Sequence, residues 1–316
     1  MTAAVLAAFI PIHALPDRRA LAPATVALAY RPVALPSGEG PLRLAGAWRI
    51  EAGDRRLGGL SGLAIDAGRF LAVTDRGAAI RFDPPSAPRP TALFSDLREG
   101  PGPFGKKWNR DAESLARDPQ GRGWWVGYEQ HHSLWLYDQR LDRAEAAIDL
   151  PKLGWRDNRG AEGLVVQGGE LLVIGENGRD AIRIERLGPK LLKLHGGADV
   201  ADAASAPDGS AWLLLREKSM SGISQSIALL AATNDGYRIG PSWSVPKAAF
   251  DNYEGMAIEA LADGRWRFWL LTDDGHRFMA RTLLVALDLA DPPRPRHDKS
   301  SATRAGPLQK PSVETP

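Results

Sequence analysis

The sequence contains no cysteine and no long apolar run. Without cysteine the chain cannot form disulfides, thiolate metal sites or a cysteine nucleophile. No segment reaches the roughly 18 consecutive apolar residues that a membrane-spanning helix needs. The 316 residues are 44% hydrophobic and 25% charged, which are ordinary globular proportions and exclude a wholly disordered or collagen-like chain.

The chain also has little excess charge of either sign, since 40 basic residues face 38 acidic ones. The small basic excess lies in the tails, because residues 292–316 hold five Lys or Arg side chains and two acids. Residues 41–291 are close to neutral. This distribution argues against a nucleic-acid partner.

Three segments differ in composition. Residues 1–40 begin with an apolar run about as long as that of a signal peptide, but prolines interrupt it and no Lys or Arg precedes Arg18. We expect residues 1–40 to form a mostly disordered leader or degraded export signal. The expected location is therefore periplasmic or secreted, with the cytoplasm as the alternative. Residues 41–290 form the predicted folded body, and residues 291–316, rich in Pro, Ser and charge, form a predicted disordered tail.

One pattern recurs five times along the body. Each copy has a short apolar segment with a polar start, a turn, and an apolar strand that ends in an acid. Two more strand-like runs follow the acid in most copies, and Leu42–Ile50 supplies the strand missing from the fifth. This period is typical of propeller blades, and closure leaves only short sheet edges. The sequence predicts an all-β β-propeller, with five four-stranded blades closed by an N-terminal strand and six blades as the alternative. The five terminal acids, 54, 47, 41 and 56 residues apart, are Asp75, Glu129, Glu176, Glu217 and Asp273.

Acids occupy two positions of the repeat that meet at one rim. Side chains alternate along a strand, so each terminal acid shares a face with the apolar residues before it and emerges where the strand leaves the sheet. In an antiparallel blade the first strand starts beside the end of the second. Glu113, Glu162 and Glu254, which begin three of the first strands, therefore join the same rim. We infer a ring of up to eight carboxylates around one mouth of the channel, with these three nearest the axis and dominant in function.

Such a ring needs compensation, because clustered carboxylates repel one another. Any single acid can be interpreted as a turn residue that accepts backbone N–H bonds, whereas acids on all five copies favour a site. Carboxylate oxygens suit Ca²⁺, which takes about six to eight oxygen ligands. The expected metal ligands are Asp75, Glu113, Glu129, Glu162, Glu176, Glu254 and Asp273.

Basic residues lie in the loops near the same rim. Most are expected to form ion pairs with the acids, and a few to contact an anionic ligand that the metal bridges. The candidates for ligand binding are Arg76, Arg110, Arg159, Lys218, His276 and Arg277.

The body also resembles the phytase-like family named for "esterase-like activity of phytase". The resemblance implies a β-propeller usually found in exported bacterial proteins, and a phosphoester or related ester substrate. Two features depart from the family pattern: Gly275-His276 follows the last acid pair where the family often has Asn, and the fourth copy lacks its leading acid. The matching stretches are Gly58–Leu63, Thr74–Arg76, Asp111–Glu113, Tyr128–Glu129, Asn158–Gly163, Asp251–Gly255, Thr272–Asp274 and Arg281–Leu284.

These observations predict a metal-dependent hydrolase of a phosphate ester or related ester, with Glu254, Glu162 and Glu113 as candidate catalytic carboxylates. One alternative is a non-catalytic propeller that binds a polar ligand or a protein at the same mouth. A lactonase-like esterase is a further alternative. The expected partner is a small anionic or ester substrate, and the expected oligomeric state is a monomer.

Overall fold

The computed structural model describes residues 19–36, 40–151, 153, 160–220, 222–248, 251–275 and 281–292. Within these ranges the regular structure is almost entirely β, with one short 3-10 helix, η2 (Lys107–Asn109). No helix in the described part of the chain is long and apolar enough to cross a membrane.

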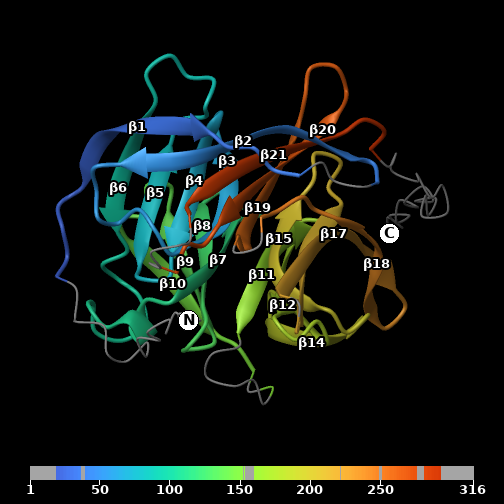
Figure 1. The fold of residues 1–316 in the computed structure, drawn as a ribbon. Helices are drawn as coiled ribbons and strands as arrows, with labels where there is room; N and C mark the ends of the chain where they lie inside the picture. The colour runs from blue at the N-terminus through green and yellow to red at the C-terminus, as the bar shows by residue number, and fades with distance from the viewer. Residues whose placement is uncertain are drawn as a thin grey trace, which may run out of the picture.

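The strands form antiparallel units of four (Figure 1), and in four of them the members follow one another along the chain. Unit 1 contains β3 (Leu60–Asp66), β4 (Arg69–Thr74), β5 (Ala78–Phe82) and β6 (Thr91–Asp96), and unit 2 contains β7 (Ala112–Arg117), β8 (Gly123–Tyr128), β9 (Ser133–Asp138) and β10 (Ala144–Asp149). Unit 3 contains β11 (Ala161–Gln167), β12 (Glu170–Gly175), β13 (Asp180–Glu185) and β14 (Gly188–His195), and unit 4 contains β15 (Asp199–Ser205), β16 (Ala211–Ser219), β17 (Gly222–Thr233) and β18 (Gly236–Ser244).

Unit 5 joins the two ends of the body, as the sequence predicts. It contains β19 (Tyr253–Ala260), β20 (Trp266–Thr272), β21 (Leu283–Leu289) and the N-terminal strand β2 (Leu42–Ala52). Strands β2 and β21 pair antiparallel from Leu42 opposite Leu289 to Arg49 opposite Leu283. The predicted closing strand is therefore confirmed.

The first strand of each unit is the innermost one. Strands β3, β7, β11, β15 and β19 contact one another in this order, and β19 contacts β3 again, so the inner strands form a closed ring. Five hydrophobic clusters fill the spaces between neighbouring units, and each draws its residues from two adjacent units. The chain is a β-propeller, as predicted.

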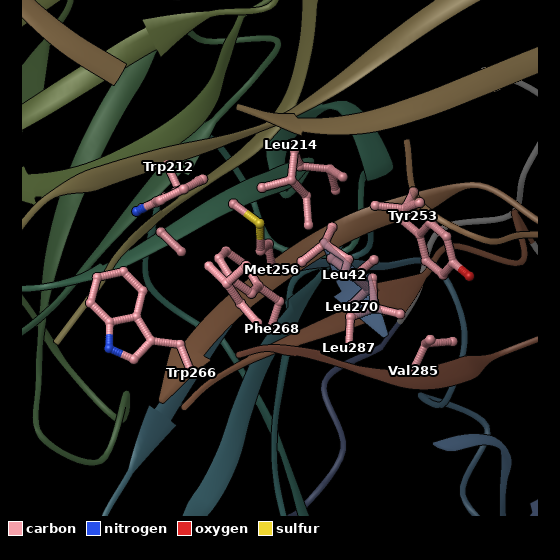
Figure 2. Packing of buried hydrophobic residues seen from close by; sticks show 14 of the residues in the cluster. Leu42, Trp212, Leu214, Tyr253, Met256, Trp266, Phe268, Leu270, Val285 and Leu287 are labelled. Atoms are coloured by element: carbon pink, nitrogen blue, oxygen red, sulfur yellow. The ribbon is translucent and has the colours of Figure 1, made fainter. Parts of the chain in front are cut away.

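Period-two alternation explains how one unit serves two clusters. In β4, Phe70 and Ala72 face unit 5, whereas Leu71 and Val73 face unit 2. Figure 2 shows the cluster between units 4 and 5, where Trp212 meets Phe268 in an edge-on contact with ring centroids 5.4 Å apart. Burial of such aromatic and aliphatic side chains from water is the main force that holds the units together.

The N-terminal segment differs from its prediction. Residues 1–40 are expected to be a leader, but β1 (Ala24–Pro32) pairs antiparallel with both β2 and β6. This strand lies between the outer edges of units 5 and 1 and joins them into one sheet. The expectation is wrong for these residues because β1 lies outside the repeat, so the spacing of the copies could not indicate it.

Candidate carboxylate site

Every inner strand has a register irregularity near its start. At this point one residue has no partner on the second strand, which is the geometry of a β-bulge, and a bulge re-aims the side chain that it carries. In β7, β11 and β19 the unpaired residue is an acid at the matching position, as the sequence predicts for the innermost strands. The five unpaired residues are Gly62, Glu113, Glu162, Ala201 and Glu254.

The residue that follows the second strand also has a fixed place. In four units its backbone N–H donates to a carbonyl just before or at the start of the first strand, which fixes both at one mouth of the ring. In unit 1 the approach is close enough to require glycine: Gly59 has φ +59°, and a Cβ there would lie 2.0 Å from Asp75 Oδ1. The four bonds join Asp75 to Gly59 (2.9 Å), Glu129 to Asp111 (3.0 Å), Glu176 to Gly160 (3.1 Å) and Asp273 to Asn252 (3.0 Å).

Unit 4 departs from the prediction by one residue. Val200, the residue before the bulge, pairs with Leu215 as Ala161 pairs with Gly175, so the ring position that Glu176 holds in unit 3 belongs to Arg216 in unit 4. Arg216 is 8% exposed, whereas Glu217 is exposed and is not part of the ring. The prediction for Glu217 is therefore wrong, because a shift of one residue moves a strand side chain to the opposite face.

We call the acids gathered at this mouth the carboxylate ring. Two groups within it bring three carboxylates so close that one oxygen from each lies within 4.8 Å of the others. The first group is Asp111, Glu113 and Glu129, and the second is Glu129, Glu162 and Glu176. Glu129 belongs to both, so it is the centre of an arc over units 2 and 3. The full ring comprises Asp75, Asp111, Glu113, Glu129, Glu162, Glu176, Glu254 and Asp273.

Lys107 closes one side of the arc. Its Nζ lies 2.8 Å from Asp75 Oδ2 and 3.1 Å from Asp111 Oδ1, so it links units 1 and 2. Burial favours the neutral amine, but the charges of the neighbouring carboxylates outweigh it and raise the pKa of Lys107 above its usual range. Lys107 is therefore a resident cation of the ring.

Arg216 closes the other side. Its Nη2 donates to Glu176 Oε1 at 2.9 Å, and its Nη1 donates to Glu254 Oε1. The guanidinium thus connects units 3 and 5 from its place in unit 4. Lys218 lies further out, with Nζ 3.8 Å from Glu176 and its side chain half exposed.

The acids between these two cations hold their protons tightly. Burial raises the pKa of Glu113 and Glu162 well above the usual range, and the neighbouring carboxylates raise it further. Burial and the charges of Asp111 and Glu176 raise the pKa of Glu129 to about 8. On the unit 5 side, burial and then the charge of Asp75 raise the pKa of Asp273 to about 8. These raised pKa values show that Lys107 and Arg216 would compensate only part of the negative charge of a fully ionised ring.

The arc fits a hard divalent cation. Among the described residues, no Lys, Arg or His forms an ion pair with Glu113, Glu129 or Glu162. The converging donors are all carboxylate oxygens, which suit Ca²⁺ better than softer metals. Within the described part of the chain, Glu254 lies outside both groups, and its buried Oε2 has no hydrogen-bond partner there.

The basic residues predicted to bind a ligand have different positions. Arg110 is buried, and its guanidinium donates to the backbone carbonyls of Leu97, Arg98, Asn109, Pro101 and Gly102. Its role is therefore structural, contrary to the expectation that it contacts a ligand. Arg76 is half-buried in the turn that follows Asp75. The remaining candidates, Arg159, His276 and Arg277, lie outside the described residues.

Three residues at this mouth were not predicted from the sequence: the ring acid Asp111 and the two cations Lys107 and Arg216. Lys107 begins the short 3-10 helix η2 before unit 2, where no strand periodicity indicates the direction of its side chain. Arg216 directly precedes Glu217, the acid that the repeat pattern indicates. Only the pairing of β15 with β16 shows that Arg216 holds the ring position. The sequence did contain a sign of this position, because strand alternation places Arg216 on the same face as the apolar residues Trp212 and Leu214.

Residues 55–276 match the model of the phytase-like family, described as "Esterase-like activity of phytase". The chain belongs to this family. The match covers most of units 1 to 5 and includes every member of the carboxylate ring. A search of curated proteins finds no match to the sequence.

Solved structures share the general shape at low identity. Glutaminyl cyclase from Myxococcus xanthus aligns with 15% identity and a TM-score of 0.47, over 79% of this chain and 97% of that one. Virginiamycin B lyase from Staphylococcus aureus aligns with 12% identity and a TM-score of 0.40, over 78% of this chain and 70% of that one. An auxiliary nutrient binding protein from Bacteroides thetaiotaomicron aligns with 10% identity and a TM-score of 0.42, over 73% of this chain and 69% of that one. At these scores the likenesses carry no argument about activity.

Proposed function

We propose that this phytase-like protein is a Ca²⁺-dependent hydrolase of a phosphate ester or related ester, with its active site at the carboxylate ring. The observation that carries the proposal is the arc around Glu129, where two groups of three carboxylates share one member. A buried arrangement of this kind is costly unless a cation balances it, so its presence at the mouth of a channel favours function.

Each part of the ring has a proposed task. Glu113, Glu129 and Glu162 would hold the cation, with Asp111 and Glu176 at the ends of the arc. A bound Ca²⁺ supplies positive charge that offsets the negative charge developing on a phosphate ester. Among the residues that the structure describes, Glu254 keeps one oxygen without a hydrogen-bond partner and lies outside the metal groups, so we assign proton transfer to that carboxyl. Lys218, exposed at the rim, would meet an anionic substrate.

A second candidate is a non-catalytic propeller that binds a polar ligand at the same mouth. The observation in its favour is that Arg216 already engages Glu254, the carboxyl to which we assign proton transfer. In that case the ring would bind Ca²⁺ and ligand without turnover. The two candidates therefore share the metal and differ in the chemistry.

The test is a panel of phosphate monoesters, phytate, aryl esters and lactones, assayed with Ca²⁺ or with EDTA. We expect hydrolysis of a phosphate ester that EDTA abolishes and Ca²⁺ restores. Glu254→Gln should reduce turnover at least about ten-fold, whereas Glu217→Gln, an exposed acid outside the ring, should not change it. Ca²⁺ binding without turnover of any compound would favour the non-catalytic binding protein. Turnover that EDTA does not change would contradict the proposed metal dependence.

A further inference from the structure

Unit 4 carries a cation where the other units carry an acid. The position directly after the second strand holds Asp75, Glu129, Glu176 and Asp273 in units 1, 2, 3 and 5. The equivalent position in unit 4 lies inside the longer strand β16 and holds Arg216, as the pairing of Val200 with Leu215 establishes. The bulge of the unit 4 inner strand also carries Ala201 in place of an acid. Unit 4 therefore contributes no carboxylate at either ring position.

Arg216 fills the space between its neighbours' carboxylates. Its two terminal nitrogens donate to Glu176 from unit 3 and to Glu254 from unit 5, and the residue is 8% exposed. An arginine guanidinium is not deprotonated in proteins, so it is a permanent charge. A fixed cation thus stands where two carboxylates from different units converge.

A guanidinium in this place competes with a metal. It occupies Glu176 Oε1 and Glu254 Oε1, two of the carboxylate oxygens that could coordinate a second cation between units 3 and 5. It also repels any divalent ion at close range, because like charges only a few ångströms apart in a partly buried site interact strongly. Arg216 contacts the arc around Glu129 only through Glu176 at its end. Among the described residues it forms no ion pair with Glu113, Glu129 or Glu162, so its repulsion toward a cation held by those three is weaker.

We propose that the ring holds a single divalent cation, in the arc around Glu129, and that Arg216 acts as the built-in replacement for a second one. This inference rests on the proposed function, in that it assumes a cation in the ring. It concerns how many cations the ring accepts and which residue sets that number. Arg216 is a positioning residue in this account, since it fixes Glu176 and Glu254 around the metal arc.

The test is Ca²⁺ binding to the full chain, measured by calorimetric titration and by equilibrium dialysis. We expect one Ca²⁺ per wild-type chain and two per chain for Arg216→Gln, because that variant frees Glu176 and Glu254. Arg216→Lys keeps the charge and should bind one. The matched control is Arg267→Gln, which breaks an ion pair of Arg267 with Asp288 away from the ring and should bind one.

The outcomes separate the two proposals. A wild-type chain that binds no Ca²⁺ would overturn the proposed function itself. Two Ca²⁺ per wild-type chain, or one for a folded Arg216→Gln, would overturn the role of Arg216 and leave the metal-dependent function standing. If Arg216→Gln does not fold, Glu254→Gln decides: Ca²⁺ affinity within about three-fold of wild type is expected, and a loss of ten-fold or more would show that Glu254 is itself a ligand.

Discussion

Glu129 is the residue on which the candidate metal site depends most. It is 8% exposed and belongs to both carboxylate groups. The sequence pattern instead predicted that the three acids of the innermost strands dominate function. Glu129→Gln preserves the shape and removes one charge, so Ca²⁺ affinity should fall by at least about ten-fold. Glu217→Gln is the matched control, because Glu217 is exposed and outside the ring. Titration calorimetry measures both, and equal affinities would contradict the assignment of Glu129.

The protonation of the ring predicts a pH dependence of stability in EDTA. Glu129 and Asp273 have pKa values of about 8 in the folded protein, above the usual values near 4 that they take when unfolded. Between these values the folded chain binds more protons than the unfolded chain, so the free energy of unfolding decreases as pH rises from about 5 to about 8.

Urea titrations at pH 5.5 and pH 8.5 should therefore show a less stable protein at the higher pH. Ca²⁺ should reverse this order, since metal ligands must be deprotonated and the ion binds better at pH 8.5. Stability in EDTA that increases between these two pH values would contradict the raised pKa values.

Alternation along the strands was enough to predict that most of these acids share one rim. Leu172, Ile174 and Glu176 share a strand face in the sequence, and the acid does emerge at the mouth. Alternation could not fix the register of β16, because either of two adjacent charged residues, Arg216 or Glu217, could have held the ring position of unit 4. Contacts made by a loop side chain, such as the bridge from Lys107 to Asp75, follow no period and needed the structure.

At the scale of the element, the bulges and the closing strands decide the geometry. The closing pair of β2 and β21 was predictable, because the fifth repeat lacks one strand and a matching apolar run precedes the first. The bulges could not be predicted, because a residue that lacks a partner on the neighbouring strand leaves almost no sign in the sequence. The one sign is an acid before a small residue, as in Glu162-Gly163. Strand β1 was not predictable from the repeat because it belongs to no unit.

Strand β1 gives the element-scale prediction. Leu28 packs in the cluster between units 5 and 1 and is 8% exposed, so Leu28→Ala should lower the free energy of unfolding by about 2–3 kcal/mol. Arg31→Ala on the same strand is the control, because its side chain is 69% exposed and should change stability by about 0.5 kcal/mol or less.

Truncation tests the same strand on a larger scale. Removal of residues 1–36 deletes β1 and should lower the melting temperature, while removal of residues 1–50 deletes most of the closing strand as well and should abolish cooperative unfolding. A 1–36 deletion as stable as the full chain would contradict a structural role for β1.

At the scale of the whole molecule, the ring exists only when all five units are assembled. Its acids come from units 1, 2, 3 and 5, and unit 4 supplies Arg216, the cation that bridges units 3 and 5. Each hydrophobic cluster joins two neighbouring units, so unfolding of one unit exposes the apolar faces of two others. Binding at the mouth is therefore coupled to the stability of the entire propeller, and a cation that binds only the folded ring stabilises it by mass action.

The measurement that tests the central claim most directly is the melting temperature of the full chain across a Ca²⁺ titration, from excess EDTA to a Ca²⁺ concentration well above the dissociation constant. At a hundred-fold excess over that constant, binding adds about 2.7 kcal/mol of stability. The melting temperature should then rise by several degrees, roughly 4–5 °C for a chain of this size. Glu129→Gln should lose most of this rise. A melting temperature that stays the same from EDTA to saturating Ca²⁺ would contradict the claim that the carboxylate ring is a cation site.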